Sequence, residues 1–98
     1  MNMELYEIWS AIAKISDGIT NQKIEFTYDR LMGAIGNCHP SEALDMILNK
    51  IDWECTSPDI DMLKEALEDL IEFNECFKIK ELMLPIDNLK EFISTKGA

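Results

Sequence analysis

Apolar residues recur three and four positions apart along most of this 98-residue chain, and this helical period constrains its fold more than any other feature. The first segment contains five of them, Leu5, Ile8, Trp9, Ile12 and Ile15. Residues at this spacing share one face of an α-helix, which can be buried against the rest of the protein. We therefore predict a helix from about Met3 to Ser16, ended by Asp17 and Gly18.

The same period predicts further helices over about residues 28–35, 41–52 and 58–76, and a last helix that begins at Pro85. Thr27 and Ser41 are suited to cap the first two of these helices, because their hydroxyl oxygens accept backbone N–H groups. Ser57 is the expected cap of the helix over residues 58–76, with Pro58 at its first helical position. Most of the chain is thus predicted to be helical.

Two short segments instead alternate polar and apolar residues, which is the period of a β-strand. They cover residues 23–26 and 77–84, although the second segment equally fits an extension of the preceding helix. The length suits one small domain, and no Gly- or Ser-rich linker divides it. We predict a single domain over residues 1–98 with an all-α or mainly α fold. The fold we expect is a compact bundle of four to five short helices, with or without a small two-stranded accessory sheet.

The formal net charge of −10 narrows the classes of partner. A direct nucleic-acid binder needs lysines and arginines to displace counterions from phosphates, so this charge opposes such binding. No apolar run approaches the length of a membrane span, and the N-terminus lacks the basic region of a secretory signal. We expect a cytoplasmic protein without membrane contact, whose three cysteines, Cys38, Cys55 and Cys76, are reduced.

Most of the charge lies in one segment. Residues 52–75 contain nine acidic residues and one lysine, a net charge of −8. At 100° per residue, five of these carboxylates fall within a stripe roughly 80° wide on one helical face. We name this stripe the acidic ridge; it consists of Asp61, Glu65, Glu68, Glu72 and Glu75. Such a ridge suits attraction of a basic partner, whereas the alternative interpretation is a solvated helix face without a partner.

Trp53 lies between two acidic residues, Asp52 and Glu54, just before this helix. Tryptophan is enriched at the energetic centres of protein interfaces, so Trp53 is a candidate anchor beside the ridge. A single tryptophan near a helix end is more often part of the core, and we favour that interpretation. The candidate partner-binding residues are therefore Asp52, Trp53 and Glu54 together with the acidic ridge.

Residue patterns typical of catalysis or metal binding are absent from the sequence. The cysteines and the single histidine, His39, do not form the Cys-x-x-Cys or His-x(3–5)-His pairs of zinc sites. There is no Gly-rich phosphate loop and no Gly-x-Ser-x-Gly turn. Carboxylates on a convex helix face stay solvated, which does not separate their pKa values for acid and base roles. We expect no enzymatic activity, no metal and no cofactor.

In size, acidity and helical content, the chain resembles immunity proteins of nuclease toxins in general. This resemblance implies a small protein that neutralises a basic partner protein, because nucleases bind their substrates in a basic groove. One alternative is a phage-type inhibitor whose carboxylates imitate the phosphates of DNA on a nucleic-acid-binding protein. Another alternative is a structural or chaperone adaptor that uses an apolar face. The identity of the partner and the oligomeric state do not follow from the sequence.

Overall fold

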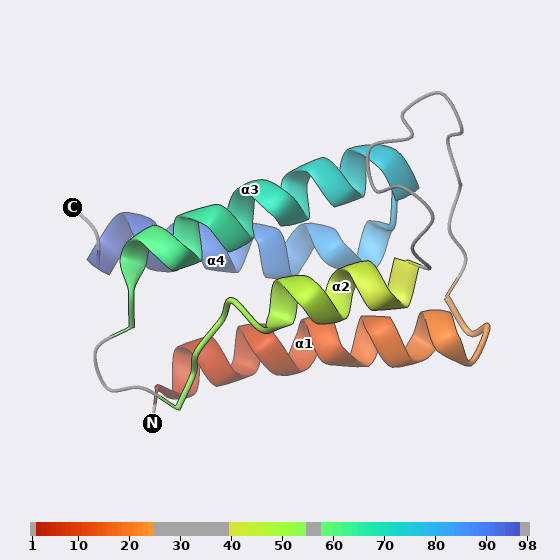
Figure 1. The fold of residues 1–98 in the computed structure, drawn as a ribbon, viewed down its shortest axis with the longest axis horizontal. Helices are drawn as coiled ribbons and strands as arrows, with labels where there is room; N and C mark the ends of the chain where they lie inside the picture. Colours follow the sequence, from red (N-terminus) through yellow and green to blue (C-terminus); the bar gives the residue numbers. More distant parts are fainter. Residues whose placement is uncertain (1, 25–39, 55–57, 97–98) are drawn as a thin grey trace.

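The computed structural model describes residues 2–24, 40–54 and 58–96 of the chain. These residues form four α-helices and one short 3₁₀-helix, η1: α1 (Met3–Thr20), α2 (Pro40–Leu48), α3 (Ile60–Phe77), η1 (Lys80–Leu82) and α4 (Met83–Lys96). Each α-helix packs against two others, in the closed order α1, α2, α3, α4 (Figure 1). The predicted all-α bundle is confirmed, and the described residues contain no β-strand.

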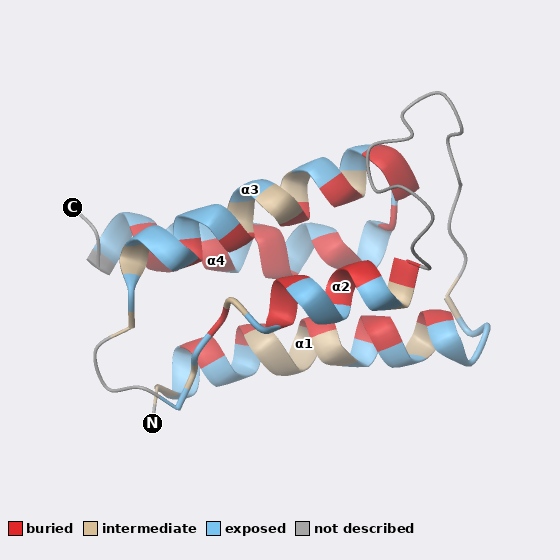
Figure 2. Ribbon diagram, in the orientation of Figure 1, coloured by how far each residue is buried: buried red, intermediate tan, exposed pale blue. Residues whose placement is uncertain are grey.

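The core lies between the four helices, where each contributes the apolar face that its period predicts (Figure 2). Its most fully buried large side chains include Leu5, Ile12, Leu44, Leu63, Leu70, Phe73 and Leu89. The rings of Phe73 and Phe77, one turn apart on α3, pack with centroids 4.6 Å apart, and both side chains are buried in the core. Burial of these faces is the main force that holds the bundle together.

α1 is longer than predicted, because it continues past Gly18 to Thr20. The extension buries Ile19, which is 2% exposed. Gly18 allows the chain to fold back closely after the helix, since a Cβ atom there would lie 2.5 Å from the Cδ1 atom of Ile24. The backbone N–H groups of Lys23 and Ile24 both donate to the Gly18 carbonyl oxygen. The glycine therefore serves the packing of the return segment and does not end the helix.

The ends of α2 and α3 also differ from the predicted boundaries. α2 ends at Leu48, after which a tight turn brings Ile51 back into the core. α3 begins at Ile60, because Asp59 is its cap: the Asp59 carboxylate accepts the backbone N–H groups of residues 61 and 62. The predicted cap Ser57 lies outside the described residues.

Residues 77–84 are not a strand. Phe77 ends α3, and Lys78 has a left-handed backbone with φ of 53°, which reverses the chain direction. The Asn74 side chain then accepts the backbone N–H of Ile79 at 2.7 Å, and η1 leads directly into α4. α4 starts at Met83, so Pro85 lies in its first turn. Proline is tolerated there, because it costs no helical hydrogen bond in the first turn. The predicted helix over residues 28–35 lies outside the described residues, as do residues 25 and 26.

Candidate interaction surface

The acidic ridge lies on the outer face of α3. All five of its carboxylate residues are exposed, whereas Leu63, Ala66 and Leu70 on the opposite face are buried. This division follows from the helical period, which places the two sets of side chains about half a turn apart. The predicted common exposed face is confirmed. The role of this face in binding stays a prediction.

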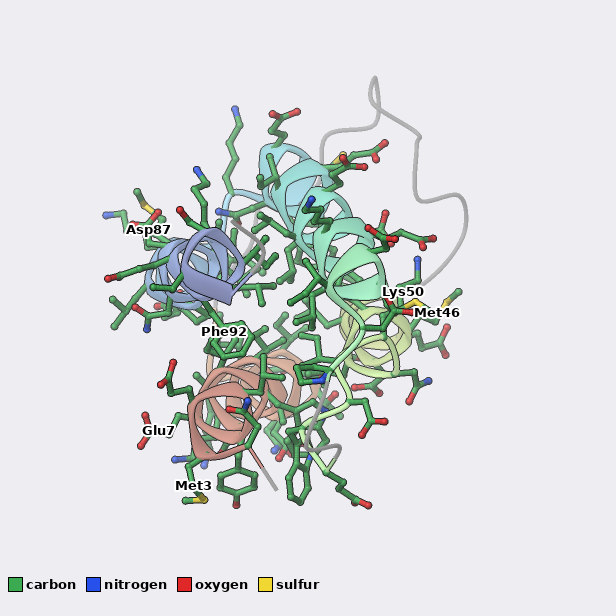
Figure 3. The ribbon with its side chains drawn as sticks, turned by 90° about the vertical axis from the view of Figure 1, so that its left-hand side faces the viewer. Met3, Glu7, Met46, Lys50, Asp87 and Phe92 are labelled. Carbon is green, nitrogen blue, oxygen red and sulfur yellow. The ribbon has the colours of Figure 1, made fainter. Side chains whose placement is uncertain are left out.

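Lys50 supplies a positive charge at the flank of the ridge. Its ammonium nitrogen lies 2.6 Å from the Asp69 carboxylate and 3.1 Å from the Glu65 carboxylate (Figure 3). The hydrogen bond to Asp69, and secondarily the one to Glu65, raise the pKa of Lys50. Lys50 lies two residues after the end of α2, so these two ion pairs join the segment that follows α2 to α3. The charge pattern of residues 52–75 did not predict this contact, because Lys50 lies outside that segment, 15 residues before Glu65.

The negative charges of the other four ridge residues are less neutralised by nearby positive charges. Asp61, Glu68, Glu72 and Glu75 form no ion pair with any residue that the structure describes. Three of them follow one another at spacings of four and three residues, where like charges on a helix repel. The C-terminal part of the ridge is therefore the more strongly acidic part of this face.

Trp53 belongs to a cluster of three aromatic rings, which we name the aromatic cluster: Tyr6, Trp9 and Trp53. The Tyr6 and Trp53 rings meet edge to face at 4.8 Å, and the Trp9 and Trp53 centroids lie 5.9 Å apart. The Asn2 backbone N–H donates to the Trp53 carbonyl oxygen at 2.8 Å, which fixes this segment beside the start of α1. Trp53 packs against the core but remains partly exposed. The favoured core interpretation thus describes only one side of this residue.

The predicted binding residues occupy two regions. Asp52, Trp53 and Glu54 lie beside the N-terminal part of α1, while the ridge follows α3 on the other side of the bundle (Figure 1). Asp52 and Glu54 are both exposed, and the Asp52 side chain accepts the Glu54 backbone N–H at 3.2 Å. A continuous surface over residues 52–75 was expected from sequence proximity alone. Residues 52–54 instead lie beside α1, apart from the ridge on α3.

Two grooves along α4 were not predicted. One has a cavity volume of about 430 Å³ between α1 and α4 and is lined by Glu4, Glu7, Ile8, Asn88, Glu91, Phe92 and Thr95. Figure 3 shows Phe92 pointing from α4 toward α1, with Glu7 near the outer edge. The other, of about 220 Å³, lies between α3 and α4 beside Ile71, Met83 and Ile86. The second groove had no signal in the sequence, because Met83 belongs to the alternating segment before the helix predicted to begin at Pro85.

Among the described side chains, there is no group of three or more His, Cys, Asp and Glu residues that would hold a metal ion. Cys76 is buried in the core, and Cys38, His39 and Cys55 lie outside the described residues. Within the described part of the chain, no helix has the length and hydrophobicity of a membrane span.

The surface therefore offers carboxylates and partly exposed aromatic rings. Carboxylates accept hydrogen bonds from lysine ammonium and arginine guanidinium groups, and indole rings attract the same cations through their faces. Both features are suited to a positively charged protein surface. No family model matches the chain, and no curated protein or solved structure shows significant similarity to it.

Proposed function

We propose that the protein binds a basic protein partner through the acidic ridge and thereby neutralises it, as an immunity protein neutralises a nuclease toxin. The observation that supports this proposal is the exposure of all five ridge carboxylates along one helix. Among the described residues, Glu65 is the one ridge member that forms an ion pair. Such a surface is complementary to the basic groove in which a nuclease holds its substrate.

Electrostatic attraction of this kind acts mainly on the rate of association. Each like-charged pair along the ridge costs about 0.2–0.5 kcal/mol of helix stability in the free protein. A basic partner placed over the ridge removes this repulsion and adds attraction. Because salt screens exposed charges over about 10 Å at 0.1 M, we expect the association rate to fall as salt is added.

Two variants with matched charge test the proposal. Glu68→Lys combined with Glu72→Lys changes the ridge, and Asp17→Lys combined with Glu81→Lys makes the same change of charge elsewhere. All four side chains are exposed and form no ion pair within the described part of the chain. The partner is captured with the wild-type protein from a lysate of the native host, identified by mass spectrometry and purified. Association is then followed by stopped flow over a range of salt concentrations.

We expect the ridge variant to associate at least about tenfold more slowly at low salt, with a weaker dependence on salt than the wild-type protein. The control variant should retain most of the wild-type rate, because its changed charges lie on α1 and η1. Equal slowing in both variants would show that only the net charge matters. That result would refute the ridge as the interface.

The adaptor alternative has one observation in its favour. Met83 and Leu84 are 61% and 68% exposed at the start of α4, and Met83 lines the groove between α3 and α4. Exposed apolar side chains mark a contact with another protein when they belong to a contiguous apolar patch. Light scattering on the purified protein tests this alternative, since a dimer that dissociates on Leu84→Lys substitution would favour it. For the alternative of DNA imitation, three further carboxylates, Glu4, Glu7 and Glu91, line the groove between α1 and α4 and are not on α3 with the ridge.

A further inference from the structure

We infer that the aromatic cluster of Tyr6, Trp9 and Trp53, with the carboxylates of Asp52 and Glu54, is a receiving site for an arginine side chain. This inference rests on the proposed function, because the arginine would belong to the same basic partner. It names a second contact, beside α1, in addition to the ridge on α3. It also states a chemical preference, arginine over lysine, that the ridge alone does not supply.

The first step concerns the position of the rings. Tyr6 and Trp9 come from α1, and Trp53 comes from the segment that follows α2, so three rings from two distant segments meet on one surface. Their inner sides contact the core, where Trp9 and Trp53 pack against buried residues. Their outer sides remain accessible: Tyr6 is 37% exposed, and Trp9 and Trp53 are of intermediate exposure. The cluster thus exposes aromatic surface to solvent, while its inner side packs against the core.

The second step concerns what surrounds the rings. Asp52 and Glu54 flank Trp53 in sequence, are exposed, and form no ion pair with any described residue. Met3, one helical turn before Tyr6, is also exposed and points outward from α1 on the side away from α3 (Figure 3). Aromatic faces beside unpaired carboxylates attract a cation that is both charged and able to stack. The surroundings therefore favour a positively charged occupant over an aliphatic one.

The third step distinguishes between the two basic side chains. The planar guanidinium group of arginine stacks on aromatic rings and also donates two parallel hydrogen bonds to a carboxylate. Lysine is a compact, strongly hydrated charge and gains less from either contact. Tyrosine, tryptophan and arginine are also the residues most enriched at the energetic centres of interfaces. Arginine is thus the side chain suited to both kinds of group in this site, aromatic rings and carboxylates.

The test relies on a property of the sequence. Trp9 and Trp53 are the two tryptophans of the whole chain, and both belong to the cluster, so tryptophan fluorescence reports on this site alone. Hexa-arginine and hexalysine peptides of equal charge are titrated into the wild-type protein at constant ionic strength. Binding is measured in parallel by the anisotropy of fluorescein-labelled peptides. Circular dichroism confirms that each variant remains folded.

We expect hexa-arginine to change the tryptophan emission with saturation and to bind about two- to fivefold more tightly than hexalysine, the range of an exposed cation–π contact. Trp53→Leu should abolish this preference, whereas Trp53→Phe should retain part of it because the ring remains. Asp52→Asn combined with Glu54→Gln should reduce it. Equal affinities for the two peptides in the wild-type protein would overturn the inference. Arginine binding without any change in tryptophan emission would overturn it as well.

The ridge variant separates this inference from the proposed function. Glu68→Lys with Glu72→Lys should weaken both peptides by a similar factor and leave the ratio of their affinities unchanged. If partner association proves independent of the ridge while the arginine preference persists, the proposed function fails and the arginine site stands. If the ridge controls association and the two peptides bind equally, the proposed function stands and the arginine site fails.

Discussion

The hydroxyl group of Ser16 on α1 forms hydrogen bonds to α2, so its removal should affect stability. Ser16 is 4% exposed, the one buried polar or charged residue in the described part of the chain. Its Oγ atom lies 3.2 Å from the Ser41 carbonyl oxygen and 3.0 Å from the Asp45 carboxylate, both on α2. We predict that Ser16→Ala lowers the free energy of unfolding.

The magnitude follows from the bonds that are lost. A hydroxyl group has one proton, so the two acceptors share a single donor. A net hydrogen bond contributes about 0.5–1.5 kcal/mol, and up to about 3 kcal/mol when the acceptor is charged. Asp45 is exposed and regains water in the variant, which keeps the loss near the lower end. Alanine also forms helix more readily than serine by about 0.5 kcal/mol. The expected net loss is therefore about 1 kcal/mol.

Ser10→Ala is the matched control. Ser10 lies on the same helix and forms no side-chain hydrogen bond within the described part of the chain, so its substitution changes helix propensity alone. Urea denaturation followed by circular dichroism measures both variants. We expect Ser16→Ala to lose about 1 kcal/mol, or about 4–8 °C in Tm, and Ser10→Ala to be unchanged or slightly more stable. Equal free energies of unfolding for the two variants would refute the role of Ser16 in joining the helices.

Three further predictions concern the cap, the core and the ion pair. Asp59→Ala removes the acceptor of two backbone N–H groups at the start of α3 and should cost about 0.5–2 kcal/mol in urea denaturation. Leu70→Ala leaves a cavity in the centre of the core and should cost about 2–5 kcal/mol, whereas Met46→Ala, at a side chain that is 63% exposed, should cost little. The pKa of Lys50 is raised in the folded protein, so its ion pair stabilises the fold fully below pH 10.5, its ordinary pKa. This contribution disappears as the pH rises through the raised pKa, and Lys50→Met should therefore show a smaller loss of stability at alkaline pH than the wild-type protein.

Each of these outcomes has a result that contradicts it. Asp59→Asn keeps a side-chain acceptor and should retain most of the cap, so equal destabilisation by Asn and Ala would argue against capping. Equal losses for Leu70→Ala and Met46→Ala would contradict the assigned core. Parallel stability curves for Lys50→Met and the wild-type protein between pH 9 and pH 12, a range set to bracket the lysine titration, would contradict the ion pair.

The existence of the helices was predictable, and their ends were less so. The apolar period identified α1, α2 and α3 because a helix that is buried on one side needs apolar residues at that spacing. Gly18 was interpreted as a stop, yet Ile19 still has apolar neighbours to bury it, so the helix continues. The alternation in residues 77–84 indicated a strand as readily as a helix. The segment is neither a strand nor an extension of α3, because the left-handed Lys78 and the Asn74 side chain end α3 and η1 leads into α4.

The candidate surface was predictable to the extent that it lies on one helix. The five ridge carboxylates share α3, and their common face follows from helical geometry without any knowledge of the other helices. The aromatic cluster was not predictable, because Trp53 is separated from Tyr6 and Trp9 by more than forty residues. From its sequence position, Trp53 was a candidate anchor beside the ridge with a core role favoured, whereas the structure places it beside the start of α1.

The sequence by itself determined which residues share a helix face, because that relationship depends only on local spacing. It thereby predicted an all-α or mainly α chain, its apolar core residues and the acidic ridge. The tertiary structure alone decided which faces meet. It brought Lys50 to Glu65 and Asp69 and placed Trp53 beside α1. Such contacts depend on how the segments between helices cross the bundle, and a pattern of residues within one helix carries no information about that path.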